Sequence, residues 1–272
     1  MKFNSAQKTL VKLLFDKRKS IIENIDFNNL NLENLIKVAS KSLLIPALNV
    51  QLKNKRLESY FPDDFLKYIE EIYKINTQRN SVLINEIKTV SDYLKKKKVN
   101  HVFLKGSALL ISGLIKDNGE RMIGDMDILV NIMDYEKTIS GLKNIGYSPN
   151  DIGEHDYVNF RHYPRMIKKN KLFAVEIHKN LIKKDILRPE FVLKNKLEVN
   201  GVNIPALKHI AEHLIYNYKI NDHGNIKAKL NIRDLYDFFN SKLSKEKISK
   251  NKYVRRFYLD ALFLNIADLD QS

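Results

Sequence analysis

The stretch HVFLKGSALLISGLIKDNGERMIGDMDILV, residues 101–130, decides the fold of this chain. It predicts a buried strand, a Gly-Ser turn, an apolar helix and a second strand, at residues 102–104, 106–107, 108–115 and 123–130. The second strand carries Asp125 and Asp127, and side chains two apart on a strand point to the same face. Neighbouring carboxylates repel each other, so this arrangement indicates a bound divalent cation.

Composition limits the class of protein. The chain has 272 residues and 44% apolar residues, enough for one large or two modest globular domains. It has no cysteine, which excludes disulfides and thiolate zinc sites and favours a reducing compartment. The N-terminus lacks the apolar core of a signal peptide, and no apolar run is long enough to cross a bilayer. We therefore expect a cytoplasmic protein without a membrane partner.

The charge balance indicates the kind of partner. Lys and Arg number 47 against 32 Asp and Glu, a net charge of +15. Such a chain attracts polyanions, first nucleic acid and second an anionic membrane surface. Lysine is abundant along the whole sequence, so a solvated surface explains much of the charge equally well.

The pattern along the chain predicts an α/β (α+β) fold with a small mixed sheet between helical flanks. Acids after Pro62 mark the start of a long helix that runs to the lysines at 95–98. Further strands are expected at 155–166 and 173–178, and a hairpin around Asn200-Gly201. Later helices are expected at 134–145, 205–218, 227–240 and 246–264. The predicted regions are a helical N-terminal region, an α/β core and a helical C-terminal region, at 1–98, 99–188 and 189–272.

Other residues in the core are suited to phosphate and metal chemistry. A glycine at a helix N-terminus lets a phosphate approach backbone N–H groups, so Gly106 and Ser107 form either such a site or an ordinary turn. Glu176 lies in the apolar strand AVEIH and is either a third metal ligand or an edge-strand glutamate. His178 shares its face and either supports the ligands or fills the core, and we favour the core.

At this point the residues resemble a known superfamily. Gly-Ser, a helix, Asp-x-Asp and a later strand acid are similar to the polymerase-β-type nucleotidyltransferases. More narrowly, LKG-(x)14-R-(x)3-DMDILV, a later Gly-Tyr and EIH, and the preceding RNSVLINEI resemble the bacterial uncharacterised nucleotidyltransferase family over roughly residues 75–240.

The resemblance implies roles for particular residues. Asp125, Asp127 and Glu176 would be the catalytic metal ligands for two Mg²⁺ ions, with Mn²⁺ as an alternative. Gly106 and Ser107 would lie at the nucleotide phosphates. Lys105 and Arg121 occupy characteristic basic positions, and would bind phosphate or hold the acidic cluster.

A second motif lies near the C-terminus. LNIRDLYDF, residues 230–238, resembles the K/R-D-L-x-D signature of the abortive-infection and toxin branch of the superfamily. The resemblance makes Lys229, Arg233 and Asp234 nucleotide-binding candidates, while the alternative is a surface helix with an ion pair. His209 and His213 have the i,i+4 spacing of a metal pair, but we interpret them as packing residues.

These observations predict an enzyme that moves a nucleoside monophosphate from an NTP to a hydroxyl and releases pyrophosphate. The basic charge favours RNA as acceptor, such as a tRNA 3′ end, in a toxin-like or RNA-modifying enzyme with an antitoxin or other protein partner. The alternatives are transfer to a small molecule of the antibiotic type, transfer to a protein side chain, and a non-catalytic RNA-binding module. We expect ATP binding, although no residue here determines the base of the NTP.

Overall fold

The computed structural model describes residues 4–150, 162–221, 231–264 and 266. Within them, a five-stranded mixed sheet and a two-stranded hairpin lie among helices, which confirms the predicted α/β (α+β) class with helical flanks. Of the strand predicted at 155–166, residues 155–161 lie outside the described residues. Lys229 lies outside them as well.

The five-stranded sheet brings the predicted carboxylates together. Its strand order is β1-β2-β5-β4-β3, and β2 and β5 are parallel neighbours at its centre. Their register places Asp127 directly opposite Glu176. The other pairs are antiparallel, so the sheet is mixed as predicted. The strands are β1 (His101–Phe103), β2 (Asp125–Val130), β3 (Tyr147–Pro149), β4 (Met166–Lys168) and β5 (Ala174–His178).

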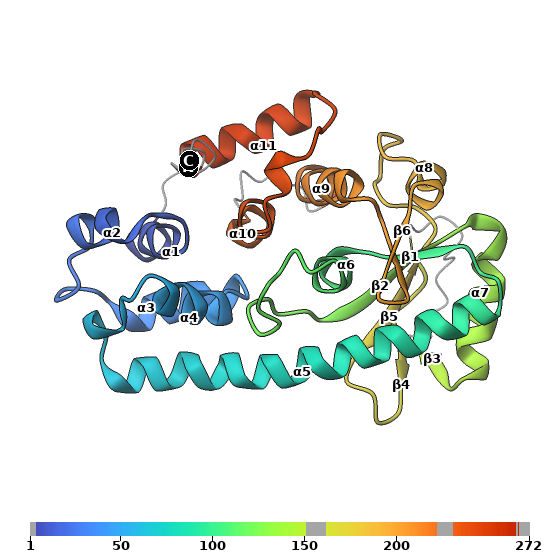
Figure 1. Ribbon diagram of the computed structural model, residues 1–272, viewed down its shortest axis with the longest axis horizontal. Coiled ribbons are helices and arrows are strands. Elements are labelled where there is room, and N and C mark those ends of the chain that lie inside the picture. The colour runs from blue at the N-terminus through green and yellow to red at the C-terminus, as the bar shows by residue number, and fades with distance from the viewer. Residues whose placement is uncertain (1–3, 151–161, 222–230, 265, 267–272) are drawn as a thin grey trace.

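Helix α5 (Asp63–Lys96) runs along almost the whole length of the molecule (Figure 1). It begins where the sequence predicted, with Asp63 and Asp64 in its first turn and Lys95 and Lys96 in its last turn, which suits the helix dipole. Its N-terminal half packs on α4, and its C-terminal half packs on the hairpin strand β7. The preceding elements are α1 (Ser5–Phe15), α2 (Arg18–Asn24), α3 (Leu32–Lys41), α4 (Ile45–Asn54) and the 3-10 turn η1 (Glu58–Tyr60).

Helix α6 (Lys105–Ile111) differs from its predicted bounds. It starts earlier, so Gly106 and Ser107 lie inside its first turn and do not form a turn before it. It ends earlier too, because Gly113 follows in the left-handed conformation (φ +72°), a common way to terminate a helix. The helix packs between α5 and α9 and against β2, at the centre of the molecule (Figure 1).

The C-terminal helices cover the side of α6 away from α5 (Figure 1). The predicted hairpin is present, with Asn200 and Gly201 both at positive φ as a type I′ turn requires. Helix α11 begins later than predicted because Asn251 caps it, accepting hydrogen bonds from two backbone N–H groups. These elements are α8 (Pro189–Lys194), β6 (Leu197–Val199), β7 (Val202–Ile204), α9 (Leu207–Tyr216), the π-helix Asn217–Asn221, α10 (Ile232–Asn240), η5 (Leu243–Lys245) and α11 (Lys252–Phe263).

Between the sheet strands β2 and β3 lie η2 (Ile132–Asp134) and α7 (Tyr135–Asn144), the latter ending before Gly146 at φ +91°. Across the described residues, no single helix has the length and apolarity to cross a membrane, and α3 with α4 meets those criteria only as a pair bent by 119°.

Candidate active site

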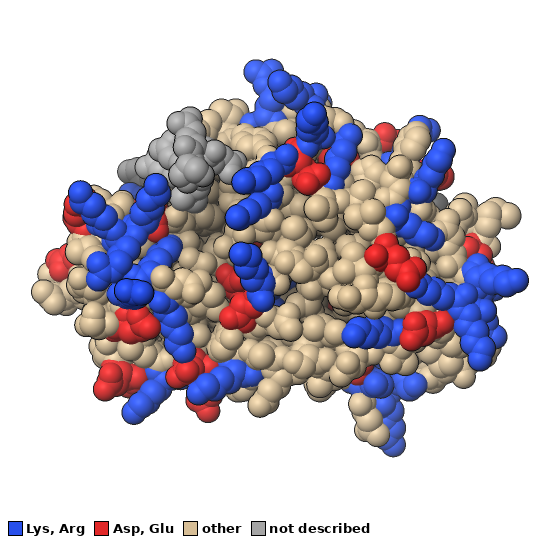
Figure 2. Space-filling model, in the orientation of Figure 1, with Lys and Arg blue, Asp and Glu red and all other residues tan. Residues whose placement is uncertain are grey.

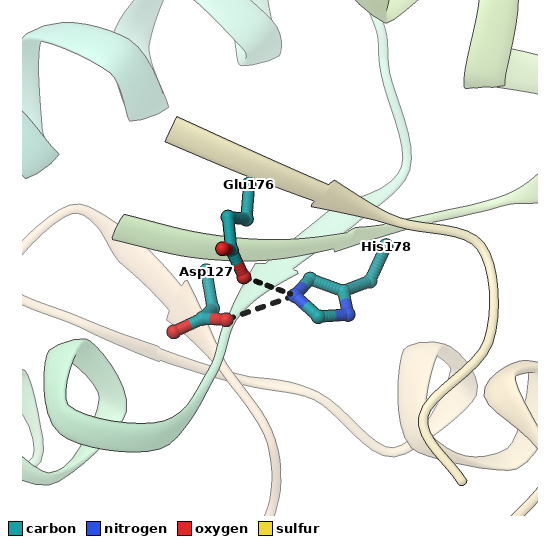
Figure 3. Close-up of side chains that lie close together, drawn as sticks. All are labelled: Asp127, Glu176 and His178. Carbon is teal, nitrogen blue, oxygen red and sulfur yellow. Dashed lines mark hydrogen bonds and ion pairs between the residues drawn. The ribbon is translucent and has the colours of Figure 1, made fainter. Parts of the chain in front are cut away.

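Three carboxylates meet on one face of the central strands. Asp125 and Asp127 come from β2 and Glu176 from the parallel strand β5, so two adjacent backbones fix their spacing. Glu176 and His178 lie on the same face of β5, two residues apart. Figure 3 shows both pointing toward Asp127, with the His178 Nε2 atom 2.8 Å from Asp127 Oδ1 and 3.6 Å from Glu176 Oε2.

Asp127 is held in its ionised form. It is buried, and burial raises the pKa of a carboxyl group, but the Lys105 ammonium and the His178 ring outweigh this and hold the pKa of Asp127 well below its usual value. Lys105 Nζ donates to Asp127 Oδ1 over 2.5 Å. Lys105 adopts a left-handed backbone (φ +49°), which is unfavourable for a residue with a Cβ, and so its placement at the start of α6 costs some strain.

His178 acts as a hydrogen-bond donor to Asp127. An ionised carboxylate only accepts, so the proton between them belongs to Nε2 of the imidazole. Nδ1 is buried and makes no hydrogen bond with the described residues. The sequence favoured a core histidine, whereas the structure joins His178 to the acidic cluster, where it orients Asp127.

Asp125 has a different partner from Asp127. The Arg165 guanidinium forms an ion pair with Asp125, and Arg165 Nε lies 4.0 Å from Glu176 Oε1. Burial raises the pKa of Asp125 above its usual value, Arg165 opposes this, and the charges of Glu176 and Asp127 add to the rise. The acidic cluster is therefore surrounded by basic side chains from α6, from β5 and from the segment before β4.

A pocket of about 520 Å³, including space open to solvent, lies beside this cluster. Lys105 belongs to both, because its ammonium contacts Asp127 and it is one of the residues that line the pocket. The opposite wall comes from α9 and α10. The charged or polar lining residues are Lys105, Arg121, His213, Asn217, Arg233, Asp234 and Asp237.

Arg121 is fixed in the pocket wall by a buried ion pair. Its Nε donates to Asp237 Oδ2 over 2.7 Å, and the two side chains are only 12% and 4% exposed. The guanidinium passes directly over Gly106, where an added Cβ would lie 2.6 Å from Arg121 Nη1. Gly106 is thus required because a larger residue would displace Arg121.

The loop that carries Arg121 is held by two asparagines of α5. Asn76 Nδ2 donates to the carbonyls of Gly119 and Arg121 (2.7 and 3.0 Å), and Asn80 Nδ2 donates to the Arg121 carbonyl over 2.8 Å and to that of Asn118. These bonds satisfy backbone groups of an irregular loop that would otherwise be buried unpaired. Within the stretch RNSVLINEI, Asn80 is therefore a residue that positions the loop carrying Arg121.

The comparison with known proteins agrees with this geometry. The family model described as uncharacterised nucleotidyltransferase matches residues 28–257, most of the chain. The chain belongs to this family. A search of the curated proteins finds no match. Membership identifies the chain as an enzyme of the nucleotidyltransferase class.

The donor set of this nucleotidyltransferase suits a divalent cation. Ligand atoms of Asp127, Glu176 and His178 all lie within 4.8 Å of one another, close enough to contact one ion. Carboxylate oxygens suit Mg²⁺ and Mn²⁺, and an imidazole nitrogen is a common ligand of softer divalent ions. As a ligand, His178 would have to give up the Nε2 proton that it donates to Asp127. The predicted set named Asp125 in that place, and Asp125 lies against Arg165 in this structure.

The predicted nucleotide-binding residues divide into two groups. The first group lines the same pocket, although its members come from α6, from the loop before β2 and from α10. These residues are Lys105, Arg121, Arg233 and Asp234. Ser107 is fully buried, and its hydroxyl makes no hydrogen bond within the described part of the chain. Gly106 is buried under Arg121.

Several residues of this nucleotidyltransferase site were not predicted. Asp237 is the second acid of the R-D-L-x-D motif, and its spacing from Arg233 on a helix could have drawn attention to it. His213 was interpreted as packing, but it lines the pocket with Lys105. Arg165 has no signal in the sequence, because it reaches Asp125 only through the pairing of β4 with β5.

Proposed function

We propose that this nucleotidyltransferase transfers a nucleoside monophosphate from an NTP to a hydroxyl acceptor with release of pyrophosphate, in a reaction that depends on Mg²⁺ or Mn²⁺. The observation that carries the proposal is the position of Lys105, whose side chain touches the acidic cluster and lines the adjacent pocket. A triphosphate in that pocket would face Lys105, Arg121 and Arg233, and its reacting end would lie toward Asp127.

Asp125, Asp127 and Glu176 would hold the cation, with His178 orienting Asp127. A divalent cation bound there supplies charge neutralisation at the phosphates and lowers the pKa of an acceptor hydroxyl. Asp127 is suited to the role of ligand and not of base, because its pKa is held low. Glu176 is then the carboxylate that takes the hydroxyl proton while the oxygen attacks the α-phosphorus and the bond to pyrophosphate breaks.

We propose RNA as the acceptor. The net charge of +15 supports this, and Figure 2 shows Lys and Arg side chains over both ends and the upper edge of one face, with fewer acids between them. The placement of Arg233 and Asp234 in the pocket supports the likeness of the C-terminal motif to the toxin branch. A protein partner such as an antitoxin belongs to the same proposal.

One experiment tests the reaction and the acceptor together. The full chain is incubated with Mg²⁺ or Mn²⁺, each α-labelled NTP in turn, and RNA, protein and small-molecule fractions from cells. We expect label in RNA, and in Asp127→Asn a rate at least about a thousandfold lower, because several kcal/mol of transition-state stabilisation depends on the bound cation.

Asp92→Asn is the matched control, since Asp92 is an exposed carboxylate on α5. It should keep the wild-type rate. Label in the protein or small-molecule fraction would overturn RNA as the acceptor while supporting the reaction. No transfer from any NTP to any fraction would overturn the reaction and leave an RNA-binding module as the better explanation.

A further inference from the structure

Arg165 occupies a position among the carboxylates that none of the predicted roles explains. Its guanidinium is paired with Asp125, and its Nε lies 4.0 Å from Glu176. Asp125 lies two residues before Asp127 on β2, and Glu176 lies directly opposite Asp127 on the adjacent strand β5. A side-chain cation therefore bridges β2 and β5 at the place where the proposed function requires carboxylate oxygens to be free for a metal ion.

The backbone of Arg165 is anchored, but its side chain is not. The Asn150 N–H donates to the Arg165 carbonyl over 2.8 Å, and the Tyr163 N–H donates to the Ile177 carbonyl over 2.8 Å. Pro164 restricts the chain between these bonds. The Arg165 side chain is nevertheless 52% exposed, so it can leave the carboxylates for solvent without disturbing the sheet.

The other basic side chains at the cluster are less free to move. The His178 side chain is 2% exposed and lies on the central strand β5. The Lys105 side chain is 34% exposed, and its backbone at the start of α6 directs it to Asp127. Arg165 is thus the most exposed of the three basic side chains that the described structure shows at these carboxylates.

We propose that Arg165 is a positioning residue that pairs with Asp125 and Glu176 in the metal-free enzyme and gives up these carboxylates when a divalent cation binds. The inference rests on the proposed function. An exposed ion pair is weak, so Arg165 competes with the cation without excluding it and sets the metal affinity. Without Arg165, a metal ion would no longer compete with a guanidinium for Asp125 and Glu176.

The test is calorimetric titration of the full chain with Mn²⁺, without nucleotide and at low salt. We expect Arg165→Gln to bind Mn²⁺ about two- to fivefold more tightly than the wild type, the size of effect when one partly exposed ion pair stops competing. Arg165→Lys keeps the charge and should stay within about twofold of the wild type. Arg255→Gln removes the same charge from the exposed face of α11 and should leave the affinity unchanged.

Two results would overturn the role of Arg165 alone. The first is an Mn²⁺ affinity in Arg165→Gln that equals or falls below that of the wild type, while circular dichroism shows an intact fold. A purely structural ion pair would give this result. Equal tightening in Arg255→Gln would reduce the effect to net charge. A wild type that binds no Mn²⁺, with Asp127→Asn giving the same titration, would instead overturn the metal site of the proposed function.

Discussion

Two arginine–aspartate pairs lie on opposite sides of this site, and they differ in nearly every physical respect. Arg121 and Asp237 are 12% and 4% exposed, with a donor–acceptor distance of 2.7 Å. Arg165 and Asp125 are 52% and 23% exposed. The buried pair joins the loop before β2 to α10, whereas the exposed pair joins β2 to the residue before β4, across the intervening strand β5.

The difference shows that an ion pair near an active site can have either of two uses. A buried pair cannot open without leaving a charge in a low-dielectric interior, so it fixes the pocket wall. An exposed pair opens at little cost, because water replaces each partner. The first therefore suits a residue that must stay in place, and the second suits a residue that must exchange its partner.

The largest expected effect comes from breaking the buried pair. Asp237→Asn should lower the free energy of unfolding by about 3–5 kcal/mol, because the Arg121 charge stays buried without a counter-ion. Urea denaturation followed by circular dichroism measures this. The double variant Arg121→Met with Asp237→Leu should recover much of the lost stability. A loss below about 1 kcal/mol in Asp237→Asn would show that this pair does not hold the pocket wall in place.

An intermediate effect is expected in the loop behind the buried pair. Asn80→Ala removes the donor to the carbonyls of Asn118 and Arg121 and should cost about 1–3 kcal/mol in urea denaturation. Asn85→Ala, on an exposed position of the same helix, should change the stability by less than about 0.5 kcal/mol. A loss below about 0.5 kcal/mol in Asn80→Ala would mean that these hydrogen bonds do not hold the Arg121 loop.

A smaller effect is expected at the exposed pair. A double-mutant cycle with Arg165→Gln and Asp125→Asn, measured in EDTA, should give a coupling energy of about 0.2–1 kcal/mol. A coupling of about 3 kcal/mol or more would place this pair in the same class as Arg121–Asp237. Arg165 could then not release Asp125 at the low cost that the proposal requires.

The smallest effect is the salt dependence that separates the two pairs. In 1 M NaCl the screening length falls to about 3 Å, so the coupling of Arg165 to Asp125 should fall toward zero. The coupling of Arg121 to Asp237, measured in a cycle of its own, should change by less than about a third, since solvent ions do not reach it. Equal losses in both cycles would contradict the difference in exposure.

Much of this architecture could be predicted from the sequence because it follows from local patterns. Alternation placed Asp125 and Asp127 on one face, and the apolar run around Glu176 gave the central strand. The Asn200-Gly201 hairpin and the start of α5 followed from turn and helix-start residues. The division into regions 1–98, 99–188 and 189–272 stays a prediction.

The partners of the site residues could not be predicted, because they depend on contacts between distant segments. Arg121 meets Asp237 across 116 positions, and Arg165 meets Asp125 across 40. Arg121 was expected to bind phosphate or to hold the acidic cluster, and in the folded chain it pairs with Asp237 of α10. The start of α6 was misplaced because a Gly-Ser pair usually signals a turn, while here Gly106 makes room for Arg121.

Helix α5 has a consequence for how the chain can change in length. It extends over 34 residues and contacts one partner after another: the Arg121 loop through Asn80, the hairpin through Ser91 and α7 through Tyr93. One residue inserted between Asn80 and Ser91 would rotate everything beyond it by about 100° and turn these side chains away from their partners. Surface loops tolerate insertions readily, whereas a single insertion in this part of α5 would break several contacts at once.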